Sequence, residues 1–143
     1  IVALYRESRF SKAAFEIVER ESPQLLLTPL TRLEVVRALA RDKDPHRLAR
    51  FREELSVSSS VRVSDVASWS EALRLAESWV ERAARRLEAG ATDTLVVSMA
   101  PLGGATHFLS FDQGSHQRVV ALAAGLAVLP RPSKSEKALA RTL

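Results

Sequence analysis

Three carboxylates, Glu34, Asp93 and Asp112, each lie beside an apolar run that is expected to be core. Glu34 follows the run at residues 25–27, Asp93 opens the run that follows it, and Asp112 closes the run at residues 107–111. A carboxylate that faces a core is costly unless a cation or hydrogen bonds compensate its charge. We therefore expect these three acids to share an acidic, metal-binding pocket.

The ligand type indicates which metal such a pocket would take. Carboxylate oxygens select Mg²⁺ or Mn²⁺, which retain several waters in an octahedral shell. An ion of this kind lowers the pKa of a bound water, orients a phosphodiester and stabilises a leaving oxygen. The three histidines, His46, His107 and His116, fall on separate predicted elements and are not expected to be ligands. The chain has no cysteine, so a thiolate site is excluded.

Each acid also has a purely structural interpretation. Glu34 is compatible with the exposed face of a helix. Asp93, which follows Thr92, would interact favourably with a helix N-terminus. Asp112, which precedes Gly114 by two residues, is a typical turn or cap residue. The joint spacing of the three acids, more than any one of them, favours a shared site.

Apolar periodicity and helix-start residues predict alternating strands and helices. The predicted helices begin near residues 10, 30, 45, 68, 92 and 115, and the predicted strands cover residues 1–4, 24–28, 61–63, 106–111 and 126–129. We expect Leu30, Leu33 and Leu39 on the inner face of the second helix. The helix from residue 68 is expected to reach residue 89 and to end at Gly90.

This alternation is typical of an α/β domain with a mainly parallel sheet flanked by helices. In such sheets the site lies beyond the carboxyl ends of the strands. Glu34 follows one strand, Asp112 ends another and Asp93 begins a helix, so all three acids are predicted at one edge. Residues 1–130 are expected to form this domain, and residues 131–143 a basic C-terminal tail that is flexible or ordered by a partner.

Composition is that of an ordinary globular protein of 143 residues with a net charge of +4. No apolar run is long enough for a membrane span and no signal peptide opens the chain, so a cytoplasmic location is expected. The basic excess lies in the tail, which leaves residues 1–130 nearly neutral. Solvated helix faces with composition bias and a phosphate-binding surface both remain open explanations for the many arginines.

The order of these motifs resembles the PIN domain family, and within it the VapC-type toxins of prokaryotic toxin–antitoxin pairs. Residues 28–34 match a Thr/Ser-x-Leu-x-x-x-Glu helix start, and residues 92–104 match an Asp-opened helix that ends in small residues. Residues 108–112, Phe-Leu-Ser-Phe-Asp, match the most specific segment, and residues 121–130 match the closing helix and strand. Pro101 departs from the pattern because proline in a helix interior should kink it.

The resemblance implies a metal-dependent endoribonuclease that hydrolyses RNA, with Glu34, Asp93 and Asp112 as catalytic Mg²⁺ or Mn²⁺ ligands. It also implies a homodimer and inhibition by a cognate antitoxin protein. Five aromatic residues are candidates for the antitoxin groove or the dimer face, with core packing as the alternative: Tyr5, Phe10, Phe15, Trp69 and Trp79. The family's first aspartate lies ahead of the segment matched by Ile1, so we expect that the natural N-terminus extends beyond this numbering.

Three other functions are compatible with parts of this pattern. A PIN-like domain without the first aspartate would bind RNA or a partner without cutting. A magnesium phosphatase on a similar sheet normally carries an Asp-x-Asp nucleophile motif after a strand, and none follows a predicted strand here. A purely structural interaction domain would leave the three acids without a cation.

Overall fold

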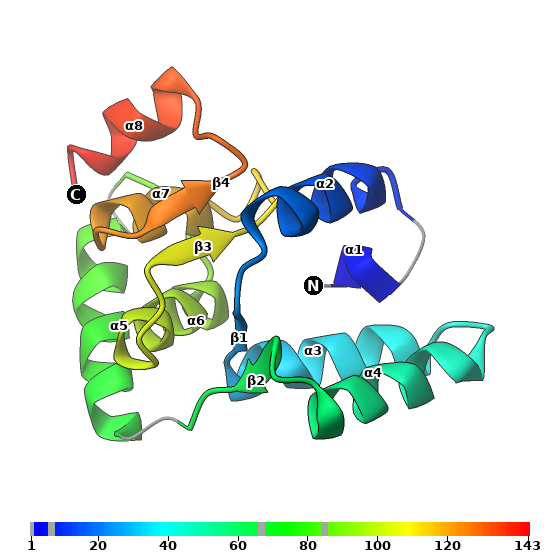
Figure 1. Cartoon of the computed structure of the whole chain (residues 1–143). Coiled ribbons are helices and arrows are strands. Elements are labelled where there is room, and N and C mark those ends of the chain that lie inside the picture. Colours follow the sequence, from blue (N-terminus) through cyan, green and yellow to red (C-terminus); the bar gives the residue numbers. More distant parts are fainter. Residues whose placement is uncertain (1, 6–7, 66–67, 84–85) are drawn as a thin grey trace. The chain divides into compact units, whose positions relative to one another are not determined.

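Helices and short parallel strands alternate along the chain (Figure 1), which confirms the predicted α/β class. The structure is a computed structural model that describes residues 2–5, 8–65, 68–83 and 86–143. The chain divides into unit 1, residues 1–65, and unit 2, residues 66–143, and each unit is described by itself. None of the described helices is both long and apolar enough to cross a membrane.

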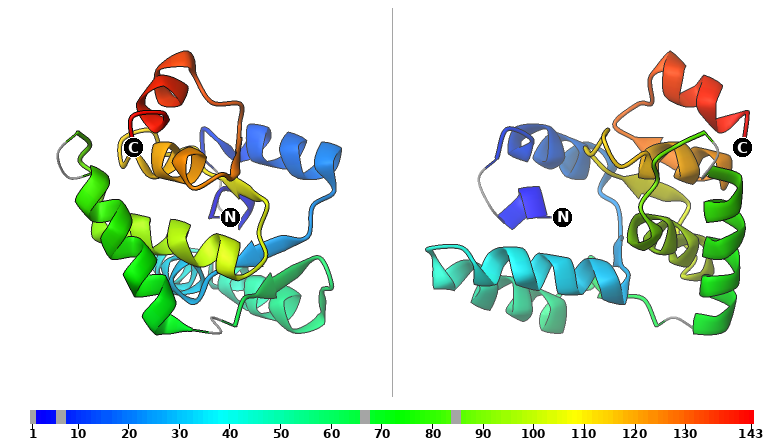
Figure 2. Two further views of the ribbon diagram at one scale, coloured as in Figure 1. Left: turned by 90° about the vertical axis from the view of Figure 1, so that its left-hand side faces the viewer. Right: turned by 180° about the vertical axis from the view of Figure 1, so that it is seen from behind.

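Unit 1 places four helices around a pair of parallel strands. Its elements are α1 (Val2–Tyr5), α2 (Ser11–Glu21), β1 (Leu25–Leu27), α3 (Pro29–Ala40), α4 (Pro45–Val57) and β2 (Val61–Val63). The strands pair with Leu25 opposite Val61 and Leu27 opposite Val63. Helices α3 and α4 lie side by side as a helical hairpin, as Figure 1 and Figure 2 both show.

Local capping chemistry sets the helix boundaries of unit 1 where the sequence predicts them. The Thr28 side chain accepts a hydrogen bond from the Thr31 amide at the start of α3, and Pro29 occupies the first helical position. Asp44 caps α4 in the same way by accepting from the His46 amide. Helix α2 ends at Glu21, and its C-cap Ser22 lies in the left-handed region with φ of 42°, directly before Pro23.

The core of unit 1 lies between the α3–α4 hairpin and the strands. Its buried residues are Leu27, Val35, Leu39, Phe51 and Val61. Leu39 is on the inner face of α3 as expected, but the same expectation for Leu33 is wrong, because Leu33 is 63% exposed. Positions two apart on a helix are about 200° apart around its axis, so burial of Val35 turns Leu33 toward solvent.

The predicted strand over residues 1–4 is also wrong, since Val2–Tyr5 form helix α1. A short apolar run does not distinguish a strand from a buried helical turn, and tertiary packing decides between them. The Tyr5 ring packs edge-on against Phe51 with centroids 5.1 Å apart, and its hydroxyl donates to the Glu54 carboxylate. Burial, followed by this hydrogen bond, raises the pKa of Tyr5.

Unit 2 repeats the architecture with a second pair of parallel strands. Its elements are α5 (Trp69–Ala83), α6 (Ala91–Leu102), β3 (His107–Leu109), α7 (Gln117–Ala123), β4 (Ala127–Leu129) and α8 (Lys134–Ala140). His107 lies opposite Ala127 and Leu109 opposite Leu129. Gly125, with φ of 84°, allows the tight turn from α7 into β4 that a side chain would disfavour. The core consists of Val97, Ala100, Val120, Ala121, Leu126 and Val128.

The structure corrects the predicted boundary between the two long helices of unit 2. Helix α5 covers Trp69–Ala83, residues 84–85 lie outside the described residues, and residues 86–89 are not helical, contrary to the prediction. Gly90 is the N-cap of α6, a role predicted for Thr92. The apolar stripe continues to Leu87, which is buried without being helical, so periodicity alone overestimated the helix length. Pro101 lies in the last turn of α6, where the helix ends at Leu102.

The expectation of a flexible tail after Pro130 is wrong for residues 134–140, which form α8. Ser133 and Glu136 make a capping box: the Ser133 hydroxyl accepts from the Glu136 amide, and the Glu136 carboxylate accepts from the Ser133 amide. Leu139, Ala140 and Leu143 pack against a small cluster of Ala83, Leu87 and Val119. These contacts order the C-terminal segment within unit 2.

Candidate acidic site

Glu34 lies on α3, five residues beyond the proline that opens the helix, and its side chain is exposed. The Thr28 cap and Pro29 fix where this helix begins and therefore which way position 34 faces. Glu34 makes no hydrogen bond or ion pair with the described residues. Its exposure shows that the expected cost of a core-facing carboxylate does not arise here.

Asp93 lies in the first turn of α6 and is partly buried. A negative charge there is favourable, because the backbone amides of the first helical turn point at it. Gly90 leaves the space that this carboxylate occupies: a Cβ at position 90 would lie 3.1 Å from Asp93 Oδ2. The absence of a side chain at Gly90 thus makes room for the Asp93 carboxylate beside the start of α6.

Asp112 follows β3 and turns the chain toward α7. Its Oδ1 accepts hydrogen bonds from the amides of Gly114, at 2.8 Å, and Ser115, at 3.4 Å. The Asp112 amide donates to Ser110 Oγ at 3.1 Å. The structure therefore gives Asp112 the turn role that the sequence allowed, whereas the N-cap of α7 is His116.

The pKa values of Asp93 and Asp112 are shifted in opposite directions. Burial raises the pKa of Asp93, and the charge of Asp112 raises it further. Burial also acts to raise the pKa of Asp112, but hydrogen bonds from Gly114, Ser115 and Gln117 together outweigh it and lower that pKa below its ordinary value. Asp112 is thus the firmly ionised member of the pair, and its charge is felt at Asp93.

This pair fits the donor chemistry of Mg²⁺ or Mn²⁺. Such an ion is commonly held by one or two carboxylates, with waters and substrate phosphates completing the shell. The repulsion that raises the pKa of Asp93 is one that a divalent cation would relieve. Among the described residues, however, no three histidine, aspartate or glutamate side chains are grouped to hold a metal ion.

Asp93 and Asp112 both lie within unit 2, and the charge of Asp112 acts on Asp93. Glu34 belongs to unit 1, and its participation in the same site stays a prediction. Asp93 lies at the N-terminus of α6, and Asp112 follows β3.

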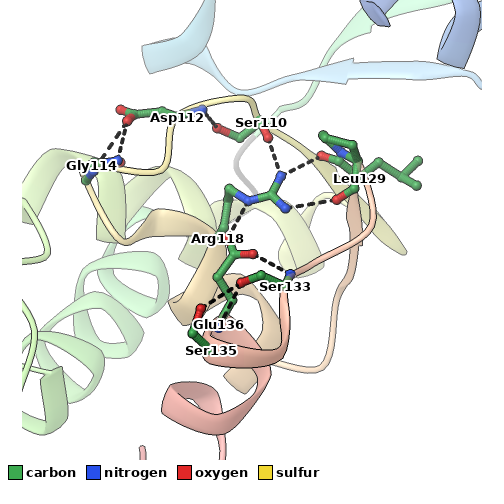
Figure 3. A network of polar contacts seen from close by, with 10 residues as sticks. Ser110, Asp112, Gly114, Arg118, Leu129, Ser133, Ser135 and Glu136 are labelled. Atoms are coloured by element: carbon green, nitrogen blue, oxygen red, sulfur yellow. Dashed lines mark hydrogen bonds and ion pairs between the residues drawn. The ribbon is translucent and has the colours of Figure 1, made fainter.

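A buried arginine, which sequence reasoning missed, supports the segment that carries Asp112 (Figure 3). Arg118 is only 3% exposed, and its Nε donates to Glu136 at 2.6 Å. Its guanidinium also donates to the backbone carbonyls of Ser110, Leu129 and Pro130. It thus joins the ends of β3 and β4 to α8, and Ser110 in turn accepts from the Asp112 amide.

Only part of this network has a signal in the sequence. The Ser-x-x-Glu spacing at residues 133–136 is a readable capping box and predicts a helix start. Arg118 stands beside Val119, Val120 and Ala121, so an unusual charge at a buried helix start is also visible. Its pairing with Glu136, 18 residues away, depends on tertiary structure and cannot be read from spacing.

Comparison with known proteins identifies the family of this chain. Residues 1–122 match the PIN domain family, a match that includes Glu34, Asp93 and Asp112 and ends within α7. No curated protein and no solved structure matches the chain significantly. The PIN domain is generally a nuclease fold, and its members usually bind divalent metal ions. With the match covering most of its length, this chain belongs to the PIN domain family.

Proposed function

We propose that this protein is a metal-dependent endoribonuclease that hydrolyses RNA phosphodiester bonds. The observation that carries the proposal is the match of residues 1–122 to a family that is generally a nuclease fold, a match that includes Glu34, Asp93 and Asp112. The charge of Asp112 also raises the pKa of Asp93. Paired carboxylates of this kind are what a Mg²⁺- or Mn²⁺-dependent phosphodiester hydrolase requires.

The described side chains have distinct roles in this proposal. Asp112, whose pKa is lowered by its hydrogen-bond donors, is the preorganised ligand. Asp93, on the α6 N-terminus, is the second ligand, and Glu34 on α3 is the third. A bound Mg²⁺ or Mn²⁺ would supply activation of the attacking water and charge stabilisation of the leaving oxygen. Arg118 is a positioning residue: its hydrogen bond to the Ser110 carbonyl holds the loop that carries Asp112.

RNA cleavage by the full-length protein tests the proposal. We expect cleavage in Mn²⁺ or Mg²⁺, none in EDTA, and a loss of at least ~100-fold in an Asp93→Asn variant, because loss of even an outer-sphere partner costs ~10–100-fold. Glu71→Gln is the matched control, since Glu71 also lies in the first turn of a helix, α5. Equal cleavage by wild type and Asp93→Asn would contradict the assignment of Asp93.

A role as the toxin of a toxin–antitoxin pair is the finer part of the proposal and is supported by the resemblance to VapC-type toxins. It includes a cytoplasmic site of action, a homodimer and a cognate antitoxin. Of the candidate aromatic residues, Tyr5 packs on Phe51, whereas Phe15 and Trp69 are 48% and 46% exposed and are free to contact a partner. Growth arrest on induction, relieved by co-expression of a cognate antitoxin, would support this role. Continued growth with active enzyme would contradict it.

A non-catalytic PIN-like domain that binds RNA or a partner is the alternative. Among the described residues, no three acids are grouped to hold a metal ion. RNA binding without cleavage, by folded protein free of antitoxin and supplied with Mn²⁺, would select this alternative.

A further inference from the structure

Unit 1 carries an open pocket of about 210 Å³ on the α3–α4 hairpin. Helix α3 contributes Arg32, helix α4 contributes Arg52, Leu55 and Ser56, and strand β2 contributes Val63. The volume is several times the ~30 Å³ share of one liquid water, so a small hydrated group fits. Two arginines and two apolar side chains thus line one concave surface.

Neither arginine of this pocket forms an ion pair with the described residues. The other arginines of the hairpin differ: Arg47 pairs with Asp42 at 3.1 Å and with Asp44 at 3.4 Å, and Arg50 pairs with Glu54 at 3.0 Å. The pocket therefore holds two cations that the described acids do not neutralise.

The nearest acid in sequence does not compensate Arg32. Glu34 is two residues further along α3, and side chains at that spacing do not face each other on a helix. The Ser56 hydroxyl donates to the Glu53 carbonyl at 2.8 Å within α4, so its proton is already used. Recognition in this pocket therefore falls to the two guanidinium groups.

Two arginines that share a pocket favour an anion with several oxygen acceptors. The planar guanidinium donates two parallel hydrogen bonds to phosphate, which a lysine point charge does not match. We propose that Arg32 and Arg52 bind a backbone phosphate of single-stranded RNA. The proposal rests on the proposed function, because RNA is the substrate that function requires, and it assigns the substrate contact to unit 1.

Binding without cleavage separates this proposal from the nuclease activity. The full-length chain is titrated, in EDTA, against a short fluorescein-labelled single-stranded RNA, and anisotropy gives the Kd at several salt concentrations. The variants are Arg32→Gln, Arg52→Gln and the double variant. Arg37→Gln is the matched control: it removes the same charge from the same helix, but Arg37 does not line the pocket.

We expect the double variant to raise the Kd roughly tenfold at low salt and to reduce the slope of log Kd against log salt by about 0.7, as loss of one single-strand phosphate contact requires. Arg37→Gln should change the slope by much less. Circular dichroism confirms that each variant is folded. Equal effects of Arg37→Gln and the pocket variants would overturn the proposal, even if metal-dependent cleavage is found.

Inorganic phosphate distinguishes an RNA phosphate from a free anion. Competition by phosphate that is stronger than competition by chloride at equal ionic strength, and that disappears in the double variant, supports the pocket. Phosphate binding that depends on the two arginines, with RNA affinity unchanged in the variants, would overturn the RNA assignment. Conversely, a protein that binds RNA through Arg32 and Arg52 but never cleaves it would support the RNA-binding pocket and contradict the proposed nuclease function.

Discussion

Asp112 in unit 2 and Glu34 in unit 1 belong to the same predicted ligand set, yet the protein holds them very differently. Asp112 accepts two backbone hydrogen bonds, and the loop that carries it is joined to two strands and α8 through Arg118. Glu34 is exposed and is positioned only by the cap and packing of α3. Asp112, although exposed, is thus positioned by backbone hydrogen bonds and by the buried Arg118 beside its loop, whereas the position of Glu34 depends on where α3 begins.

The largest expected effect comes from breaking the network on the Asp112 side. Arg118→Met should lower the free energy of unfolding by ~3–5 kcal/mol, because Glu136 and three backbone carbonyls lose their partner in a buried place. Arg131→Met, at an exposed position, is the control. Urea unfolding measures both. A loss below ~1 kcal/mol would mean that water replaces the guanidinium and that the loop does not depend on it.

The same ion pair predicts a pH dependence of stability. The hydrogen bond from Arg118 lowers the pKa of Glu136 to about 2, from an ordinary value of 4.5. A lowered folded-state pKa contributes stability that is present above the ordinary pKa and is lost as pH falls toward the folded one. After allowance for solvent screening, wild type should lose ~1–2 kcal/mol more than Glu136→Gln between about pH 5 and about pH 2. Parallel pH profiles of urea unfolding for the two proteins would contradict this.

On the Glu34 side, the cap of α3 is the element to break. Thr28→Ala should cost ~1 kcal/mol of unfolding free energy, because the Thr31 amide loses its acceptor. Thr28→Ser, which keeps the hydroxyl, should retain most of it. If Glu34 is a ligand held only by its helix, Thr28→Ala should also weaken cleavage more than Thr28→Ser does. Identical cleavage rates of Thr28→Ala and Thr28→Ser, at matched concentrations of folded protein, would show that the cap of α3 does not affect cleavage.

The smallest and most specific effect concerns the coupling within unit 2. Asp112→Asn removes one of the two causes that raise the pKa of Asp93, so that pKa should fall while staying above its ordinary value because burial remains. Carboxyl ¹³C NMR titration without divalent ions measures it, with Glu71→Gln as the control. An unchanged Asp93 pKa would show that the two charges do not interact.

Local signals predicted much of the framework of the site. The predicted helix starts near residues 30 and 45 are right, because the Thr28 and Asp44 caps and the prolines that follow them act over a short range. Asp93 in the first turn of α6 and Asp112 after β3 are placed as predicted for the same reason.

The errors have a common physical origin in tertiary contacts. The run at residues 2–5 is helical because Tyr5 packs on Phe51, 46 positions later in the chain. Leu87 is buried outside a helix, which made the predicted helix before Gly90 too long. The tail is ordered by a pairing between Arg118 and Glu136 that no local pattern encodes. Sequence reasoning thus placed the candidate acids on their elements and missed the tertiary contacts of Arg118 that support the Asp112 loop.

The proposed nuclease function requires that Asp93 and Asp112 jointly hold a divalent metal ion. Electron paramagnetic resonance of Mn²⁺ titrated into the full-length chain tests it most directly, because it requires neither an RNA target nor turnover. The account predicts saturable Mn²⁺ binding that weakens at least ~10-fold in both Asp93→Asn and Asp112→Asn and is unchanged in Glu71→Gln. Equal Mn²⁺ affinity in all four proteins would contradict it.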